Sequence, residues 1–336
     1  MDIKHNLTID DIARNLGVSK TTVSRAISGK GRISEATRVR VQEYIRKHNY
    51  RPNAAAKGLA ESRTYNIALV LPKAFIKLNL PHIRQCMSAI CEEAFLQDYN
   101  ILLCLSTDDS LPPLMRTIDN RKVDGVILSR TIENDPIVAV LHKRGIPFST
   151  IGSLPPEDRG KAIVETDHDQ VGGCRAFSKA FIQSGQGKIA LLGNDLGYIV
   201  NQSRLAGFRQ AAEELNFPDD MVGLRMGLDD RITRSHAAEE MAALGYRRFL
   251  CMDEDVCVHA MERLQQLGYR IPEDIQIASL YDSEQLTTTT PPVSALGFSA
   301  ADIGRAACRE LLLYLKGEHY DPNPVLGYRI IKRESV

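Results

Sequence analysis

From Asn66 onward, short apolar runs of strand length alternate with amphipathic segments of helix length. A strand, helix, strand order at this spacing predicts parallel sheets that are covered by helices on both faces. About 270 residues exceed the needs of one such sheet, so we expect two doubly wound parallel sheets in a two-lobed α/β body. A ligand would bind between them, near the carboxyl ends of the strands. The expected strands are 66–72, 99–106, 123–129, 146–152, 162–167, 188–194, 247–253 and 275–282.

The first 50 residues instead predict three short helices. Thr8 and Asp11 are spaced for a capping box, and Gly17 ends the first helix. Ser19 and Ser34 can cap the second and third helices. Two helices joined by a short turn at Gly17 match a helix-turn-helix. The expected core positions are Ile9, Ile12, Ala13, Leu16, Val23, Ala26, Ile27, Val41, Tyr44 and Ile45.

The second of these helices has an unusual polar face. Between Ile12 and Ser34 there are five basic residues and no Asp or Glu. A solvated surface would explain a polar face, but surface helices usually carry both charge signs. Side chains that donate hydrogen bonds and do not repel phosphate suit a helix in the major groove of DNA. The outward-facing donors are Lys20, Thr21, Thr22, Ser24 and Arg25.

Charge is unevenly distributed along the chain, although the net charge is zero. Residues 1–63 contain 13 Lys and Arg against 6 Asp and Glu, whereas the remainder contains 29 against 36. A basic first part and an acidic body indicate that a polyanion meets only one end of the protein.

Seven cysteines without CxxC spacing, most of them in apolar surroundings, favour reduced, buried thiols over disulfides. The first residues show no signal peptide, and no apolar run approaches membrane-spanning length. We therefore expect a cytoplasmic protein without a membrane segment.

The stretch RPNAAAKGLAESRT, residues 51–64, separates the two patterns. Asn53 can cap a helix over 53–60, but two turns are too few to hold in isolation. The predicted domains are a headpiece at 1–50, a hinge segment at 51–63 and a body at 64–336.

Residues 7–60 closely resemble the start of the lactose-repressor (LacI/GalR-type) family of bacterial transcription regulators. The TxxDIAxxxGVSxxTVSRxxxG core, the NYRPN turn and the AxxLA end match at family spacing, and DGVI, SRLAGF and LYD continue the resemblance into the body. It implies a DNA-binding headpiece on a body like that of periplasmic binding proteins. It also implies a regulator, more often a repressor, that binds near-palindromic operators as a homodimer. The final residues carry no leucine heptads of the kind that make some relatives tetramers.

The resemblance assigns roles to individual headpiece residues. Lys20 and Thr21 would read bases, and the hinge would become helical only on operator DNA, inserting Leu59 into the minor groove. Such a wedge can unstack a base step. Gly58 departs from the family pattern and should raise the cost of ordering this hinge. The full set of expected DNA contacts is Thr8, Ser19, Lys20, Thr21, Thr22, Ser24, Arg25, Asn49, Arg51, Asn53, Ala56 and Leu59.

In the body, the resemblance places Arg204, Asp253 and Asp282 at family effector contacts. A carbohydrate needs such carboxylates and an Arg fork, with an apolar wall that Phe75 and Phe298 could supply. Asp253 followed by Glu254 replaces the family's usual Asn followed by Asp, so the pocket is more acidic. A cross-cleft salt bridge between Arg204 and Asp282 is the structural alternative, and Tyr198 could stack on a purine-like corepressor.

Other classes of protein fit less well. A transport protein would share the two-lobed fold but leave the helix-turn-helix unexplained, and an enzyme would lack a phosphate loop or nucleophile motif. The TDHDQ cluster at 166–170 lies where the family has a strand-to-helix turn, so we expect no metal, no cofactor and no catalytic residue. A regulator that answers to a partner protein also remains open.

Overall fold

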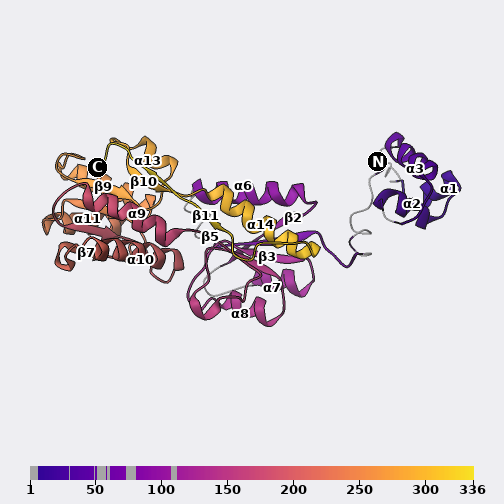
Figure 1. Cartoon of the computed structure of the whole chain (residues 1–336), viewed down its shortest axis with the longest axis horizontal. Coiled ribbons are helices and arrows are strands. Elements are labelled where there is room, and N and C mark those ends of the chain that lie inside the picture. Colours follow the sequence, from indigo (N-terminus) through magenta and orange to yellow (C-terminus); the bar gives the residue numbers. More distant parts are fainter. Residues whose placement is uncertain are drawn as a thin grey trace. The chain divides into compact units, whose positions relative to one another are not determined.

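The computed structural model describes residues 7–29, 31–48, 50, 58, 61–72, 81–106 and 112–336. The chain divides into two compact units, Met1–Thr64 and Tyr65–Val336. Figure 1 shows the helices of the first unit and the two lobes of the second.

The first unit contains α1 (Ile9–Leu16), α2 (Lys20–Ser28) and α3 (Glu35–Lys47). The capping box of Thr8 and Asp11 is present, Ser19 and Ser34 cap the next two helices, and Gly17 ends α1 with a left-handed φ of 62°. The predicted core is confirmed: Ile12, Ala13, Val23, Ala26 and Val41 are buried, and Ile9, Leu16, Ile27, Tyr44 and Ile45 pack against them.

The first lobe of the body is built on a six-stranded sheet with the order β11-β5-β4-β3-β1-β2, all parallel. Its elements are β1 (Asn66–Pro72), α6 (Pro81–Leu96), β2 (Asn100–Ser106), α7 (Pro112–Asp119), β3 (Gly125–Leu128), α8 (Pro136–Lys143), β4 (Phe148–Ile151), the 3-10 turn Pro156–Asp158, β5 (Val164–His168), α14 (Ala300–Lys316) and β11 (Val325–Leu326).

The second lobe has a sheet of order β12-β10-β9-β8-β6-β7, in which only β12 is antiparallel to its neighbour. Its elements are α9 (Gln170–Gln183), β6 (Ile189–Leu192), α10 (Ile199–Glu214), the 3-10 turn Asp219–Met221, β7 (Val222–Arg225), α11 (Arg231–Ala243), β8 (Arg248–Cys251), α12 (Glu254–Gln266), β9 (Gln276–Ser279), α13 (Glu284–Thr288), β10 (Ser294–Gly297) and β12 (Arg329–Ile331).

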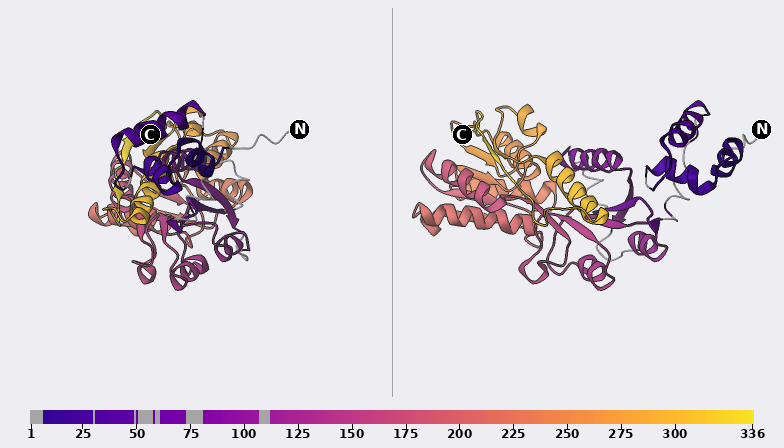
Figure 2. Two further views of the ribbon diagram at one scale, coloured as in Figure 1. Left: turned by 90° about the vertical axis from the view of Figure 1, so that its right-hand side faces the viewer. Right: turned by 45° about the vertical axis from the view of Figure 1, so that its right-hand side comes forward.

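Helices cover both faces of each sheet, as the views of Figure 2 also show. Strand β1 illustrates the cause, because Ala68 and Val70 point into one core while Ile67, Leu69 and Leu71 point into the other. A strand buried on both faces must be apolar throughout, which is the run that the sequence shows.

The chain crosses between the lobes three times: after β5, after β10 and between β11 and β12. The second crossing brings α14 back to the first lobe, where it packs on α6. Three connections restrict the lobes to motions about a common hinge.

The eight predicted strands and both sheets are confirmed, whereas β7, β10, β11 and β12 were not predicted. β11 and β12 have two and three residues, which is too short for a period to be visible. β7 and β10 have four residues, as does the predicted strand β6, so length does not explain why they were missed.

Buried thiols are confirmed for Cys104, Cys174, Cys251, Cys257 and Cys308, and all seven cysteines are free. The prediction is wrong for Cys91, which is exposed, and Cys86 is half-buried. Within the described ranges, every helix is too short or too polar to cross a membrane.

Candidate functional site

The exposed face of α2 is the first candidate site. Its outward residues Lys20, Thr21, Ser24 and Arg25 are exposed, while Val23 and Ala26 hold the opposite face in the core. No residue of α2 is acidic. The helix therefore presents ammonium, guanidinium and hydroxyl donors on one side, as an element that enters a DNA groove requires.

Two of the predicted DNA contacts, Thr8 and Ser19, use their hydroxyls to cap the N-termini of α1 and α2. The Ser19 hydroxyl lies 2.9 Å from that of Thr22 and accepts from the Thr22 amide at 3.1 Å. The Thr8 hydroxyl donates to Asp11 at 2.6 Å. Caps of this kind fix the start of each helix, so these residues position the surface as well as belonging to it.

The exposed face of α2 has an acidic neighbour on α1. The charge pattern of α2 alone did not reveal this neighbour. The Lys20 ammonium lies 2.5 Å from a carboxylate oxygen of Asp10, with 68% and 44% of the two side chains exposed. Arg14 pairs with Asp11 at 3.6 Å on the same helix. The run Ile12–Ser34 lacks acids in sequence, but the folded surface does not.

Five predicted DNA contacts lie outside the described residues: Asn49, Arg51, Asn53, Ala56 and Leu59.

The facing ends of the two lobes, where the sequence predicts an effector cleft, are the second candidate site. On the first lobe, Ser106, Ser129, Arg130 and Asp135 line a small pocket at the ends of β2 and β3. Arg130 pairs with Asp135 at 3.4 Å, and Asp135 also caps α8. The carboxyl ends of parallel strands meet here, which is where ligands bind in open α/β sheets.

Arg204 lies on α10 of the second lobe and is buried. Its guanidinium stands 5.5 Å from the ring centre of Tyr281 and donates to Asn201 at 3.4 Å, while Nε has no hydrogen-bond partner among the described residues. Arg204 takes part in none of the salt bridges found among the described residues. A buried donor without a partner is costly, so Arg204 is available to a ligand.

Two carboxylates respond to Arg204 from a greater distance. Burial raises the pKa of Asp253, as does neighbouring Glu254, whereas Arg204 lowers it. Burial also raises the pKa of Asp167, against hydrogen bonds from Ser153 and the charge of Arg204. Asp253 caps α12 through the Val256 amide at 2.9 Å and accepts from the Asn194 side chain.

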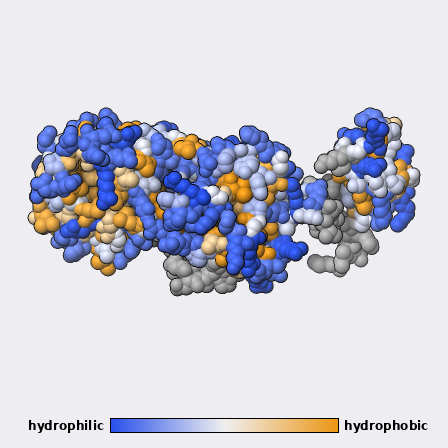
Figure 3. Space-filling view, turned by 60° about the horizontal axis from the view of Figure 1, so that its bottom comes forward, coloured by the Kyte–Doolittle hydropathy of each residue, from blue (hydrophilic) through white to orange (hydrophobic). Residues whose placement is uncertain are grey.

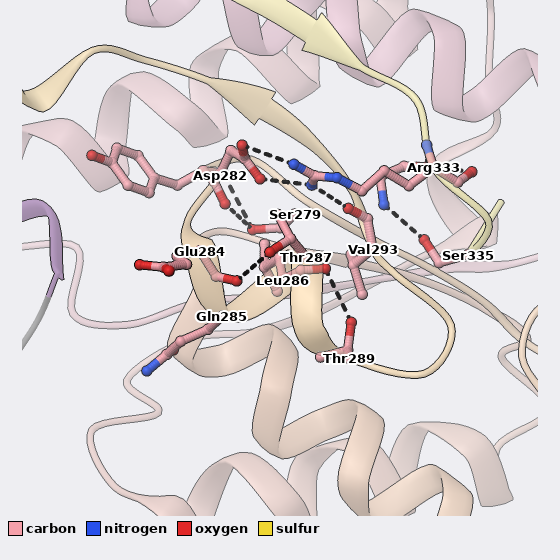
Figure 4. Close-up of polar contacts among 12 residues, drawn as sticks. Ser279, Asp282, Glu284, Gln285, Leu286, Thr287, Thr289, Val293, Arg333 and Ser335 are labelled. Carbon is pink, nitrogen blue, oxygen red and sulfur yellow. Dashed lines mark hydrogen bonds and ion pairs between the residues drawn. The ribbon is translucent and has the colours of Figure 1, made fainter.

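Asp282 follows β9, and its carboxylate is bound side-on by Arg333, as Figure 4 shows. The distances are 2.7 Å and 3.0 Å to the two oxygens. The expected alternative of a salt bridge between Arg204 and Asp282 is therefore wrong, because the partner comes from the segment after β12. Paired ligand hydroxyls would have to use the lone pairs that Arg333 leaves open.

The three aromatic residues that were predicted to contact the effector do not lie together. Phe298 is buried at the crossing after β10, with its ring 4.9 Å from that of His168 and 6.2 Å from that of Tyr281. Tyr198 precedes α10 and forms an isolated bridge with Ile132 of the first lobe. Phe75 lies outside the described residues.

Two cleft residues were missed altogether. His82 on α6 contacts Glu254 at 3.0 Å across the cleft, and Arg333 holds Asp282. Neither has a local motif that marks it. The described residues contain no cluster of three or more His, Cys, Asp or Glu arranged to hold a metal, and Cys251 and Cys257 lie in the core.

Comparison with known proteins assigns both parts of the chain. Residues 8–53 match bacterial regulatory proteins of the lacI family, and residues 179–336 match a periplasmic binding protein-like domain. The chain therefore combines a LacI-family helix-turn-helix domain with a periplasmic binding protein-like domain.

Curated relatives match this chain along nearly its whole length. Catabolite control protein A of Staphylococcus xylosus is 26% identical, covering 98% of this chain and 99% of the relative. The HTH-type transcriptional repressor PurR of Aliivibrio salmonicida is 27% identical, covering 98% of each. The ribose operon repressor of Haemophilus influenzae is also 27% identical, covering 98% and 96%.

Solved structures show the same fold. The transcriptional regulator CelR in complex with cellobiose has a TM-score of 0.71 and 25% identity, covering 98% of this chain and 100% of that one. The lac repressor dimer bound to operator and an anti-inducer has a TM-score of 0.78 and 21% identity, with 98% of each chain covered. The predicted headpiece and two-lobed body are thereby confirmed.

Proposed function

We propose that this regulator represses transcription by binding a near-palindromic operator as a homodimer, with α2 of each subunit in the major groove. The observation that carries the proposal is the exposed face of α2, with Lys20, Thr21, Ser24 and Arg25 and no acid in the helix. Base edges would be read by Lys20 and Thr21, and Thr22, Ser24 and Arg25 would contact the DNA backbone or base edges.

Domain roles follow from the same proposal. Residues 1–50 would be the DNA-binding headpiece, 51–63 the hinge and 64–336 the effector-binding and dimerisation body. The division into compact units at Thr64 supports this assignment. Leu59 would be the minor-groove wedge, and Asn49, Arg51, Asn53 and Ala56 would complete the contacts.

A second copy of the chain would bind the exposed apolar side chains of α6 and β2. Phe95 is 79% exposed, Leu96 75% and Leu103 46%. A second exposed set, Leu224, Ile232 and Leu244, belongs to β7, α11 and its end. Figure 3 shows apolar residues gathered at the end of the body formed by the second lobe. Neighbouring large apolar side chains on the surface are typical of an interface.

The effector would be a sugar or sugar derivative bound between the lobes. Buried Arg204 with an unpartnered Nε, partly buried Asp253 and the side-chain amide of Asn194 provide donors and acceptors for hydroxyls. The cellobiose complex of CelR supports this class of ligand. A purine-like corepressor is the alternative: the bridge of Tyr198 with Ile132 is made by the backbone, so the Tyr198 ring could still stack on a base.

As a regulator of DNA, the protein would act in the cytoplasm and without enzymatic activity, cofactor or resident metal. We assign no catalytic role to any residue.

Binding-site selection with the purified chain tests the DNA-binding proposal. Enrichment of a near-palindromic sequence over random competitor is expected, and no enrichment with or without candidate effectors contradicts it. Thermal-shift screening against sugars, sugar acids, sugar phosphates and nucleobases tests the effector. A true ligand at 100 times its dissociation constant adds about 2.7 kcal/mol of stability.

A further inference from the structure

The two lobes are joined across the cleft by contacts other than the three chain crossings. One group links residues 131–133 of the first lobe to residues 197–202 of the second. The Ile199 amide donates to Thr131 O at 3.2 Å, and the Glu133 amide donates to Gly197 O at 3.1 Å. The Gln202 side chain donates to Glu133 at 2.7 Å. These bonds exist only while the two segments touch.

A separate contact is made by His82 and Glu254. Nδ1 of His82, in the first turn of α6, lies 3.0 Å from Oε1 of Glu254, the first residue of α12. The His82 ring also packs edge-on against Tyr281 at 5.1 Å between centroids. The contact therefore joins α6 of one lobe to both α12 and the end of β9 in the other.

Burial makes this contact sensitive to the lobe arrangement. Only 3% of the Glu254 side chain is exposed, against 28% of that of His82. A buried carboxylate needs a hydrogen-bond donor, and His82 Nδ1–H supplies it from the opposite lobe. If the lobes separate, both groups return to water, so the pair stabilises the closed arrangement only.

We propose that His82 and Glu254 form a latch that holds the effector cleft closed without effector. The proposal rests on the proposed function of the cleft, but it concerns the lobe equilibrium rather than ligand identity. The latch sets the closed fraction of the free protein, and with it the apparent effector affinity, because only the difference in binding to the two states can shift them. His82 and Glu254 are positioning residues in this role.

Amide hydrogen exchange of the full chain tests the latch without a known effector. The amides of Glu133 and Ile199 report closure, since their acceptors lie on the other lobe. In His82→Ala, exchange in peptides that contain these amides should be about tenfold faster, as loss of a hydrogen bond to a charged group predicts. Amides of β1, which bond within one lobe, should not change.

Two further variants sharpen the result. His82→Gln retains a side-chain donor and should restore part of the protection. Arg175→Ala breaks a pair of 2.9 Å with Glu214 inside the second lobe and should leave the reporter amides unchanged. The latch is tested at His82 rather than at Glu254 because the His82 side chain is the more exposed of the two, so its substitution disturbs the surrounding packing less.

Unchanged exchange at Glu133 and Ile199 in His82→Ala would overturn the latch. Equal acceleration in Arg175→Ala would overturn it as well, because the effect would then be general loosening. Operator selection on the same samples separates the two proposals. If a sequence is selected but exchange is unchanged, the latch alone is contradicted. If exchange is faster but no sequence is selected, only the proposed DNA-binding function is contradicted.

Discussion

The guanidinium of Arg333 binds both carboxylate oxygens of Asp282, at 2.7 Å and 3.0 Å, from the segment that follows β12. Arg333 also donates to the carbonyl of Val293 at 2.6 Å. Ser335, which is fully buried, bonds to Ile277 and Ser294 in the same sheet. The segment after β12 thus fixes the position of the Asp282 carboxylate beyond the end of β9.

Arg333→Ala should lower the free energy of unfolding by about 2–3 kcal/mol. Removing one partner of a buried ion pair leaves an uncompensated charge, which destabilises a protein. Because 15% and 19% of the two side chains are exposed, water can solvate part of the remaining charge, and the loss should be smaller than for a fully buried pair. Urea denaturation followed by circular dichroism measures it. Lys332→Ala is the matched control, because Lys332 is exposed beside Arg333 and should shift stability by less than about 0.5 kcal/mol. Equal losses in both variants would contradict a specific role of the pair.

Local patterning was sufficient to predict most of the fold. Strand β1 is apolar from Ile67 to Pro72 because both of its faces are buried there, and the caps at Thr8, Ser19 and Ser34 follow from residue type and spacing. Signals of this kind depend on neighbours in the chain. Short strands such as β11, which has two residues, carry no period and could not be found.

The cleft was predicted only in part, because its polar partners come from distant segments. Arg204 and Asp282 were assigned from family resemblance, yet Asp282 pairs with Arg333, 51 residues away. His82 and Glu254 are 172 residues apart. A side chain that is paired across the fold leaves no spacing signal in the sequence, so its partner appears only once the chain is folded.

Gly207 in the SRLAGF stretch allows α10 to pack closely on α9. A Cβ at this position would lie 2.6 Å from Cys174 Cβ and 2.7 Å from Val171 O. Because a backbone oxygen cannot easily move away, Gly207→Ala should cost about 1–3 kcal/mol through overpacking. Urea denaturation compares it with Gly327→Ala, where a Cβ would meet nothing within 4 Å. A neutral Gly207→Ala would show that the helices can separate without strain.

Phe95→Glu should weaken the homodimer. An exposed Phe that is covered by a second subunit contributes apolar burial, and a carboxylate there would be desolvated without a partner. We expect the dissociation constant to rise at least about tenfold in sedimentation equilibrium. Val325→Glu, on β11 at the edge of the sheet opposite β2 and 68% exposed, should leave the dissociation constant unchanged. A dimer of normal affinity in Phe95→Glu would place the interface elsewhere.

His168 should make the protein less stable as the pH falls. Burial lowers its pKa from 6.5 to about 4, against a backbone hydrogen bond with Ser299 and the charge of Asp302. Above pH 6.5 the imidazole is neutral in both folded and unfolded chains, so nothing is lost. Below it, the unfolded chain binds a proton that the folded chain does not, which costs about 2 kcal/mol at pH 5.

Chemical denaturation of the wild type and His168→Gln at pH 7 and pH 5 measures this contribution. The variant should lose less stability than the wild type over the interval, since Gln does not titrate. Asp167 and Asp253, whose pKa values are raised by their partial burial, favour the opposite trend in both proteins, and their contributions cancel in the comparison. Identical losses in the two proteins would mean that His168 is protonated as readily in the folded chain as in the unfolded one.

The pair of Lys20 and Asp10 should separate base reading from simple charge. Lys20→Ala should weaken the preference for one base pair in each half-site, because a side chain that reads a base is lost. The binding free energy for the preferred sequence should fall by about 1–3 kcal/mol. Asp10→Asn removes a negative charge that lies 2.5 Å from the Lys20 ammonium, so it should tighten binding to all sequences alike. Arg14→Ala, whose side chain is 78% exposed on α1, serves as the control that alters affinity without changing base preference.

Binding-site selection and titrations at several salt concentrations distinguish these effects. A changed base preference in Asp10→Asn would instead assign Asp10 a direct part in reading the operator.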